Sequence, residues 1–158
     1  MTKANLRTAI LTQLRAELAL LTQAALLARD EAISEESRAH SKYDTHGQEA
    51  AYLAEGQGRL AGEIENSIAL YTTLPLPDFL PDQAIAVGSL VELASAAGSQ
   101  RYFFGPRAGG VELPDERGRI LVITPQSPIG RQLLGRHVGD VIPGPGKAST
   151  PLRIVSVA

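Results

Sequence analysis

The sequence contains no cysteine and no tryptophan, and only 4% of its residues are aromatic. Without cysteine there can be no disulfide bond, no thiolate zinc site and no cysteine nucleophile, and the composition fits a reducing cytoplasm. The scarcity of aromatic residues argues against functions that depend on stacking with bases or sugars. With 158 residues, 44% of them hydrophobic, the chain has the composition of one globular domain or two small ones.

Neither sign of charge predominates. The formal net charge is -2 and the pI is about 5.9, so the basic surface that attracts free DNA or RNA is not expected. The N-terminal segment also lacks a long apolar run, because Arg7, Gln13, Arg15 and Glu17 interrupt it at helical spacing. A signal peptide and a membrane span each need such a run. We therefore expect a cytoplasmic protein without a membrane partner.

Proline is absent from residues 1–74, and all ten prolines lie in residues 75–158. The same boundary separates sequence rich in Ala and Leu from sequence rich in Val, Ile and Gly. Pro75, Pro77 and Pro81 stand at the junction, where proline cannot continue a helix. The sequence therefore predicts a helical unit over 1–74, a proline-rich linker over 75–82 and a second domain over 83–158.

Two apolar stripes run through the first half with a spacing typical of helices. The first stripe contains Leu6, Ile10, Leu14, Leu18, Leu21, Ala25, Ala28 and Ala32. The second contains Leu53, Leu60, Ile64, Ile68 and Tyr71, with Gln57 at one seam position. This pattern predicts an antiparallel coiled-coil hairpin with arms of about 30 residues, or roughly 45 Å. Glycines of the second arm, at 56, 58 and 62, either allow a close approach of the arms or make the arm locally flexible.

Short apolar segments separated by glycine and proline turns fill the second half. A buried strand is predicted at 120–124 and a last strand at 152–157. Between them one short helix is predicted at 129–134, with Ser127 as its N-cap, Pro128 in its first turn and Gly135 after its end. The predicted fold class is therefore α+β: a helical hairpin followed by an antiparallel β-sheet domain with one short helix.

The segment ITPQSPIGRQLLGRHVGDVI, residues 123–142, resembles the C-terminal signature of the bacterial transcript-cleavage factors GreA and GreB. The matching positions are Ser127, Pro128, Ile129, Gly130, Arg131, Leu133, Leu134, Gly135, Gly139 and Asp140. The resemblance implies an N-terminal coiled coil and an FKBP-like C-terminal domain that docks on the rim of the secondary channel of RNA polymerase. The residues expected to contact the polymerase are Ser127, Pro128, Ile129, Gly130, Arg131 and Leu134.

The resemblance also implies a role for the hairpin. It would enter the channel, where acidic residues at its tip help to hold a second Mg²⁺ at the active site of the polymerase. The polymerase itself cleaves the backtracked RNA, so the factor is not an enzyme and has no cofactor of its own. We therefore expect a monomeric regulator of transcription elongation, with RNA polymerase as its partner and the 3′ end of the nascent RNA as a second candidate partner.

The predicted tip, residues 43–49, reads YDTHGQE. Its candidate acids are Asp44, which would share the polymerase Mg²⁺, and Glu49. Gly47 or Gln48, depending on the alignment, stands where the family has its second acid. Three interpretations stay open: a structural turn between helices, a tip that occupies the channel as an inhibitor or modulator without supporting cleavage, and a tip that stimulates cleavage.

Another hypothesis gives the second half a different function. An FKBP-like domain could be a prolyl isomerase or chaperone, which needs an aromatic pocket to hold proline. The aromatic residues of this half are Phe79, Tyr102, Phe103 and Phe104. We rank this hypothesis below polymerase binding because so few aromatic residues are present.

Four arginines of the second half could form a basic face for an RNA end or an acidic partner, or they could be ordinary solvated side chains. They are Arg101, Arg107, Arg131 and Arg136. The glycine-rich segment 105–110, GPRAGG, lacks the Gly-Lys-Ser/Thr of a phosphate loop and is predicted to be a turn.

Overall fold

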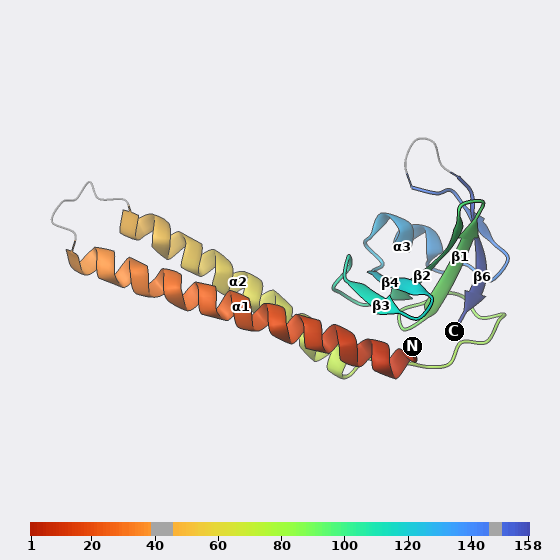
Figure 1. Ribbon diagram of the computed structural model, residues 1–158, viewed down its shortest axis with the longest axis horizontal. Helices are drawn as coiled ribbons and strands as arrows, with labels where there is room; N and C mark the ends of the chain where they lie inside the picture. Colours follow the sequence, from red (N-terminus) through yellow and green to blue (C-terminus); the bar gives the residue numbers. More distant parts are fainter. Residues whose placement is uncertain (39–45, 146–149) are drawn as a thin grey trace. The chain divides into compact units, whose positions relative to one another are not determined.

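The computed structural model describes residues 1–38, 46–145 and 150–158, and at residues 32, 35–38, 46–51, 53 and 54 it describes the backbone alone. The described residues form three helices and six strands (Figure 1). They are α1 (Lys3–Arg38), α2 (His46–Thr72), β1 (Leu90–Ser95), β2 (Gly98–Phe104), β3 (Glu112–Asp115), β4 (Gly118–Ile123), α3 (Pro128–Leu133), β5 (Val141–Ile142) and β6 (Leu152–Val157). The chain divides into two compact units, one made of Met1–Ile10 with Leu70–Ala158 and the other of Leu11–Ala69.

The second unit, which we call the arm, is a helical hairpin. Figure 1 shows α1 and α2 side by side and running in opposite directions. On α1 the predicted stripe is confirmed: Leu14 and Ala28 are buried, and Leu18, Leu21 and Ala25 are half-buried. Each helix of the arm therefore buries an apolar stripe that it could not bury alone.

The seam of α2 differs from the predicted stripe by one position. Leu60 is 49% exposed, whereas Ala61 is buried and Gln57, Ile64 and Ile68 are half-buried. Positions 57, 61, 64 and 68 repeat with the alternating spacing of four and three that keeps side chains on one helical face. Leu60 lies on the flank of that face, so counting it in the seam was wrong.

The glycines of α2 do not produce a close approach of the arms. A Cβ added at Gly58 or Gly62 would meet no described atom within 4 Å, and at Gly56 it would meet only the Arg59 side chain at 4.0 Å. The expectation that they allow close packing is therefore wrong for the described atoms. The alternative, local flexibility of the arm, stays a prediction; each glycine is expected to lower the stability of the helix by about 1 kcal/mol relative to alanine.

Helix α1 carries apolar side chains outside its seam as well. Leu20, Leu26, Leu27 and Ile33 are all more than half exposed. The stretch Lys3–Glu31 is accordingly long and apolar enough to cross a membrane by length and composition. This is weak evidence for a membrane span, since core helices of soluble proteins meet the same criterion.

The other unit contains a six-stranded sheet in the order β3-β4-β2-β1-β6-β5. The α+β class and the single short helix after the buried strand are as predicted, and β6 spans the predicted residues. Four of its strand pairings are antiparallel, but β2 and β4 are parallel, with Arg101 opposite Ile120 and Phe104 opposite Ile123. The sheet is therefore mixed, and the expectation of a purely antiparallel sheet needs this correction. After β2 the chain forms β3 on the far side of β4, so β4 enters the sheet beside β2 in the same direction.

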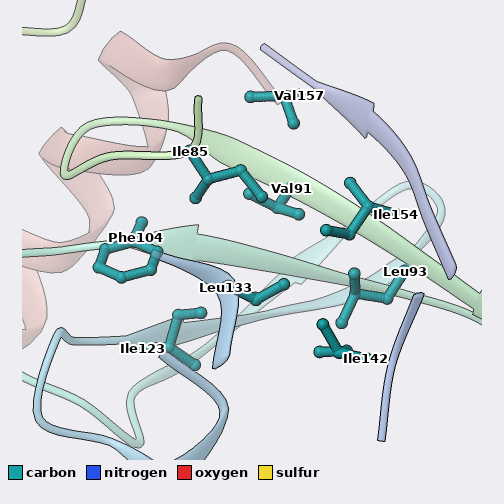
Figure 2. Packing of buried hydrophobic residues seen from close by; sticks show 9 residues of the cluster. All are labelled: Ile85, Val91, Leu93, Phe104, Ile123, Leu133, Ile142, Ile154 and Val157. Carbon is teal, nitrogen blue, oxygen red and sulfur yellow. The ribbon is translucent and has the colours of Figure 1, made fainter. Parts of the chain in front are cut away.

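One face of this sheet is covered by α3. The hydrophobic core on this face contains Ile85, Val91, Leu93, Phe104, Ile123, Leu133, Ile142, Ile154 and Val157 (Figure 2). Successive side chains of a strand point to opposite faces, so Phe103 of β2 and Val122 of β4 face away from this core. Both are fully buried, as are Leu6 and Ile10 of α1, which belong to the same unit. The start of α1 is therefore part of the sheet unit.

The proline-rich segment after α2 is held at several points by this unit. Arg7 Nη1 donates a hydrogen bond of 3.1 Å to the carbonyl oxygen of Leu74, and Lys3 Nζ donates to that of Pro77. A Cβ added at Gly88, where φ is +96°, would lie 3.0 Å from the carbonyl oxygen of Pro75. Residues 74–77 are thus packed against the start of α1 and the turn before β1.

Candidate partner-binding surface

Helix α3 begins with the predicted side-chain cap. Ser127 Oγ accepts a hydrogen bond from the backbone N–H of Gly130 at 3.2 Å, and its hydroxyl donates to the carbonyl oxygen of Thr124 at 2.8 Å. Pro128 occupies the first helical position, where the missing N–H costs nothing. The prediction that Ser127 caps this helix is confirmed.

Gly130 lies where no side chain fits. A Cβ at this position would be 1.8 Å from the carbonyl oxygen of Thr124 and 2.7 Å from Ser127 Oγ. Both neighbours are fixed by the cap hydrogen bonds, so neither can move aside. Glycine at 130 is therefore a requirement of the turn that leads into α3.

The end of α3 is also fixed by backbone geometry. Leu134 is the C-cap, and Gly135 follows with a φ of +79°, the conformation in which glycine ends helices. The N–H of Gly135 donates to the carbonyl oxygen of Ile85, and the N–H of Ile85 donates to that of Arg136. Buried Leu133 anchors the helix in the core between these ends.

The predicted partner-binding residues fall into two groups. Pro128, Arg131 and Leu134 are exposed, with half of the Leu134 surface accessible to solvent. Ser127 and Ile129 are half-buried, Ile129 packs against the core, and Gly130 is buried. We call the exposed set Pro128, Arg131 and Leu134 the α3 surface. Binding of a partner by these residues stays a prediction, and Ser127 and Gly130 shape the surface without forming it.

Sequence patterns did not point to two exposed apolar residues downstream. Val138 is 36% exposed and Val141 is 57% exposed. Val141 pairs with Arg153 of β6, and its neighbour Ile142 faces the core. The alternation of exposed and buried residues in so short a strand could have indicated this, but two residues are too few for a pattern.

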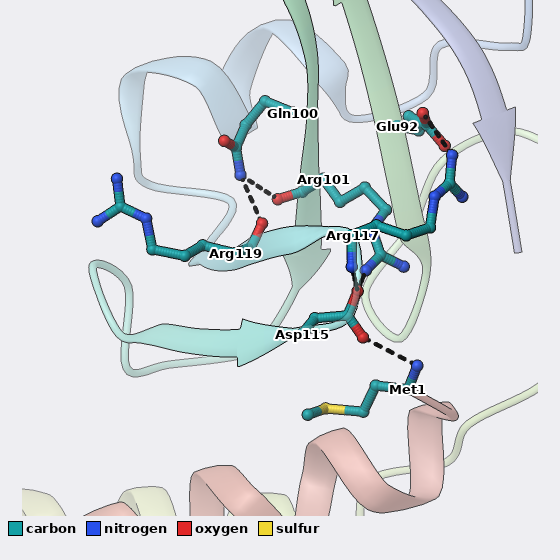
Figure 3. A network of polar contacts seen from close by, with 7 residues as sticks. All are labelled: Met1, Glu92, Gln100, Arg101, Asp115, Arg117 and Arg119. Atoms are coloured by element: carbon teal, nitrogen blue, oxygen red, sulfur yellow. Dashed lines mark hydrogen bonds and ion pairs between the residues drawn. The ribbon is translucent and has the colours of Figure 1, made fainter.

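Arg101 does not belong to a basic surface face. Its side chain is mostly buried and forms an ion pair with Asp115, which also pairs with the N-terminal amine at 2.9 Å (Figure 3). The expected placement of Arg101 on a solvent-accessible face is therefore wrong. The β-hairpin of β3 and β4 brings Asp115 next to Arg101 through the sheet, which sequence spacing alone does not reveal.

A hollow of about 220 Å³ lies beside Arg101 and is lined by two further arginines. Arg117 pairs with Glu92 at 3.3 Å, and Arg119 pairs with Glu112 at 2.5 Å. Gln100 Nε2 donates to the carbonyl oxygen of Arg119 at 2.8 Å (Figure 3). Every guanidinium group here has a carboxylate partner, so the hollow is not strongly attractive to an anion.

The predicted tip acids lie largely outside the described residues. Asp44, the proposed Mg²⁺ ligand, lies outside them, and Glu49 lies in the first turn of α2 with its side chain undescribed. Gly47 and Gln48 are also in this first turn. Among the residues with described side chains, no three His, Cys, Asp or Glu side chains come together as a metal site.

The aromatic residues of the sheet unit are used in packing. Phe103 and Phe104 are fully buried, and Phe79 and Tyr102 pack against the core. Burial raises the pKa of the Tyr102 hydroxyl, consistent with its apolar surroundings. Their use in packing weakens the prolyl isomerase hypothesis.

Comparison with known proteins gives likeness in structure only. No family model matches the sequence, and no curated protein matches it. GreA factor homolog 1 (Gfh1) of Thermus thermophilus aligns with a TM-score of 0.38 and 19% identity over 94% of each chain. Gfh1 of Thermus aquaticus aligns with a TM-score of 0.40 and 22% identity over 98% of this chain and 92% of that chain.

A further solved structure is described as the prokaryotic transcription elongation factor GreA/GreB from Nitrosomonas europaea. It aligns with a TM-score of 0.38 and 22% identity over 60% of this chain and 78% of that chain. At these values the likeness does not by itself assign a function to this chain.

Proposed function

We propose that this chain is a regulator of transcription elongation that binds RNA polymerase through the α3 surface. The proposal rests on the way in which segment 123–142 folds. Ser127, Gly130 and Leu133 build and anchor the helix, while Pro128, Arg131 and Leu134 are left exposed. Apolar residues mixed with arginine are typical of the centres of protein interfaces. The segment therefore provides a rigid scaffold for a small docking surface.

We further propose that the arm enters the secondary channel of the polymerase. Helix α1 has 36 residues, which at 1.5 Å per residue gives a length of about 54 Å. A channel tens of Å deep needs a thin element of this length. The predicted tip, which includes Asp44, is the part of the arm that would bring acidic residues into the channel.

The residues of the predicted tip favour a regulator that occupies the channel without stimulating cleavage. Gly47 and Gln48 stand where the family has its second acid, and neither supplies a carboxylate. Glu49 is the alternative partner of Asp44 if the alignment shifts by one residue. In either case the polymerase supplies the catalysis and the Mg²⁺, so the chain is not an enzyme and has no cofactor of its own. We place it in the cytoplasm as a monomer.

Binding is tested with the fluorescently labelled chain and bacterial core RNA polymerase. We expect Leu134→Asp to weaken binding at least tenfold. Leu80→Asp is the matched control, because Leu80 is similarly exposed, at 60%, and lies outside the α3 surface. Circular dichroism verifies that both variants fold. Equal affinities for both variants, or no binding of the unmodified chain, would contradict the proposal.

Cleavage is tested in a stalled elongation complex with Mg²⁺. At a saturating concentration of the chain we expect no increase in the rate of transcript cleavage, and we expect competition with an added cleavage factor. If the chain does stimulate cleavage, and Asp44→Ala abolishes the stimulation, the tip is a cleavage-stimulating tip and the non-cleaving alternative is wrong.

A further inference from the structure

The glycine-rich segment 105–110, which we call the 105–110 loop, lies directly against the segment that leads into α3. The N–H of Gly105 donates to the carbonyl oxygen of Ile123 at 2.8 Å, and the N–H of Gly110 donates to that of Val122 at 2.9 Å. A Cβ added at Gly109 would lie 3.3 Å from Thr124 Cγ2. Thr124 therefore contacts the loop with its side chain, while its carbonyl oxygen contacts the start of α3.

The backbone of the loop is held in one conformation. The buried Tyr71 donates a hydrogen bond from its hydroxyl to the carbonyl oxygen of Arg107 at 2.6 Å. Ala108 follows with a φ of +62°, a left-handed conformation that non-glycine residues seldom adopt, and Gly110 has a φ of +93°. The Arg107 side chain is exposed although its backbone is fixed. Such an arginine loses less conformational freedom on binding than one on a mobile loop.

The loop and the α3 region together carry an unusual charge. The 105–110 loop and residues 123–142 contain three arginines, Arg107, Arg131 and Arg136, and one acid, Asp140. Their formal charge is therefore +2, in a chain with a net charge of -2. All three arginines are exposed, and none has an ion-pair partner among the described residues. Arg101 and Arg119 of the neighbouring strands and Arg117 of the turn between β3 and β4, by contrast, are all paired.

We propose that the 105–110 loop is a second part of the partner-binding surface, and that Arg107 binds a carboxylate on the partner protein. The guanidinium fork matches a carboxylate in two parallel hydrogen bonds. An acidic protein surface fits better than a nucleic acid, because these two segments contain no Phe, Tyr or Trp for stacking and carry apolar Pro128 and Leu134 among the arginines. The inference rests on the proposed function, and it specifies that the polymerase surface in contact with Arg107 carries a carboxylate.

The test compares two charge reversals, Arg107→Glu and Arg153→Glu. Arg153 is an exposed arginine of β6 that pairs with Val141, outside both segments. Affinity for core RNA polymerase is measured at about 50 mM and about 200 mM salt, since screening weakens charge pairs at the higher concentration. We expect Arg107→Glu to weaken binding at least tenfold at low salt, with a smaller difference at high salt. Arg153→Glu should leave the affinity within twofold.

The possible results separate this inference from the proposed function. If Leu134→Asp weakens binding and Arg107→Glu does not, the loop is outside the interface and the inference is wrong while the proposed function stands. If the unmodified chain does not bind the polymerase, the proposed function fails first. If the chain binds a single-stranded RNA of about 15 nucleotides, and Arg107→Glu abolishes that binding, the partner of Arg107 is a phosphate and the carboxylate assignment is wrong.

Discussion

The backbone of Gly105 lies against the hydroxyl group of Tyr71, so closely that a Cβ added at Gly105 would be 2.0 Å from the hydroxyl oxygen. The same hydroxyl donates to the carbonyl oxygen of Arg107. The last turn of α2 is thereby joined to the 105–110 loop within the sheet unit. A residue other than glycine at 105 would displace Tyr71 and break this connection.

Replacing Tyr71 with phenylalanine removes the donor and leaves the Arg107 carbonyl without its partner. We expect Tyr71→Phe to lower the free energy of unfolding by about 1–2 kcal/mol, measured by urea denaturation. The control is Tyr52→Phe, because Tyr52 is 74% exposed; its effect should stay within about 0.5 kcal/mol. An effect of Tyr71→Phe no larger than that of the control would show that the hydrogen bond is not stabilising.

Tyr71 should also make stability depend on alkaline pH. Burial raises the pKa of its hydroxyl above the ordinary value, so in the unfolded chain it loses its proton at a lower pH, near 10. Its contribution to stability is complete below about pH 10 and is lost as the pH rises further. We expect urea denaturation between about pH 8 and about pH 11 to show a smaller alkaline loss in Tyr71→Phe than in the unmodified chain.

Burial also shifts the pKa of two other groups in the described part of the chain, and the comparison between the two proteins controls for them. Burial raises the pKa of Tyr102, which adds to the alkaline loss, and burial lowers the pKa of Lys3, which acts in the opposite sense. Tyr102 and Lys3 are present in both the unmodified chain and Tyr71→Phe. The difference between the two curves of unfolding free energy against pH therefore reports on Tyr71. Parallel curves would contradict the assignment.

Gly130→Ala tests the close approach to Thr124. Because the added Cβ would collide with a backbone oxygen, we expect a loss of at least about 2–3 kcal/mol, or failure to fold. Gly58→Ala is expected to have the opposite effect on stability, because a Cβ at position 58 would meet no described atom within 4 Å. There we expect a gain of about 0.5–1 kcal/mol from helix propensity. Melting temperatures of the two variants should therefore move in opposite directions.

Ser127→Ala tests the helix cap independently of the glycine. Loss of the hydrogen bond to the Gly130 N–H should cost about 1 kcal/mol, within a range of 0.5–2. Ser127→Thr should recover part of this loss, because the threonine hydroxyl can accept from the Gly130 N–H and donate to the Thr124 carbonyl oxygen as serine does. Denaturation curves for both variants check this order. The same stability for alanine and threonine at 127 would argue that the cap hydrogen bond is unimportant.

Features that depend on neighbouring residues could be predicted from the sequence. The stripe of α1 follows from helical spacing, and the short helix follows from Ser127, Pro128 and Gly135, whose preferences are local. The last strand is a run of apolar and β-branched residues after a proline. In each case the physical cause lies within a few residues of the element it produces.

Features that depend on distant parts of the chain could not be predicted. The parallel pairing of β2 with β4 depends on where β3 is placed, and the strand patterns do not specify partners. Burial of Arg101 depends on Asp115 of the β-hairpin. The position of the 105–110 loop beside residues 122–124 was not predicted for the same reason, because a turn gains such neighbours only through the sheet.

The sheet unit is discontinuous in sequence, since Met1–Ile10 precedes the arm and Leu70–Ala158 follows it. The arm is therefore an insertion, and a ribosome that has made residues 1–69 has not yet made the rest of the unit to which the first turns of α1 belong. A fragment beginning at the proline-rich segment would lack Leu6 and Ile10, together with the donors on Lys3 and Arg7. Conversely, matched residues could be deleted from both helices of the arm near the bend, and the sheet unit would keep all of its own contacts.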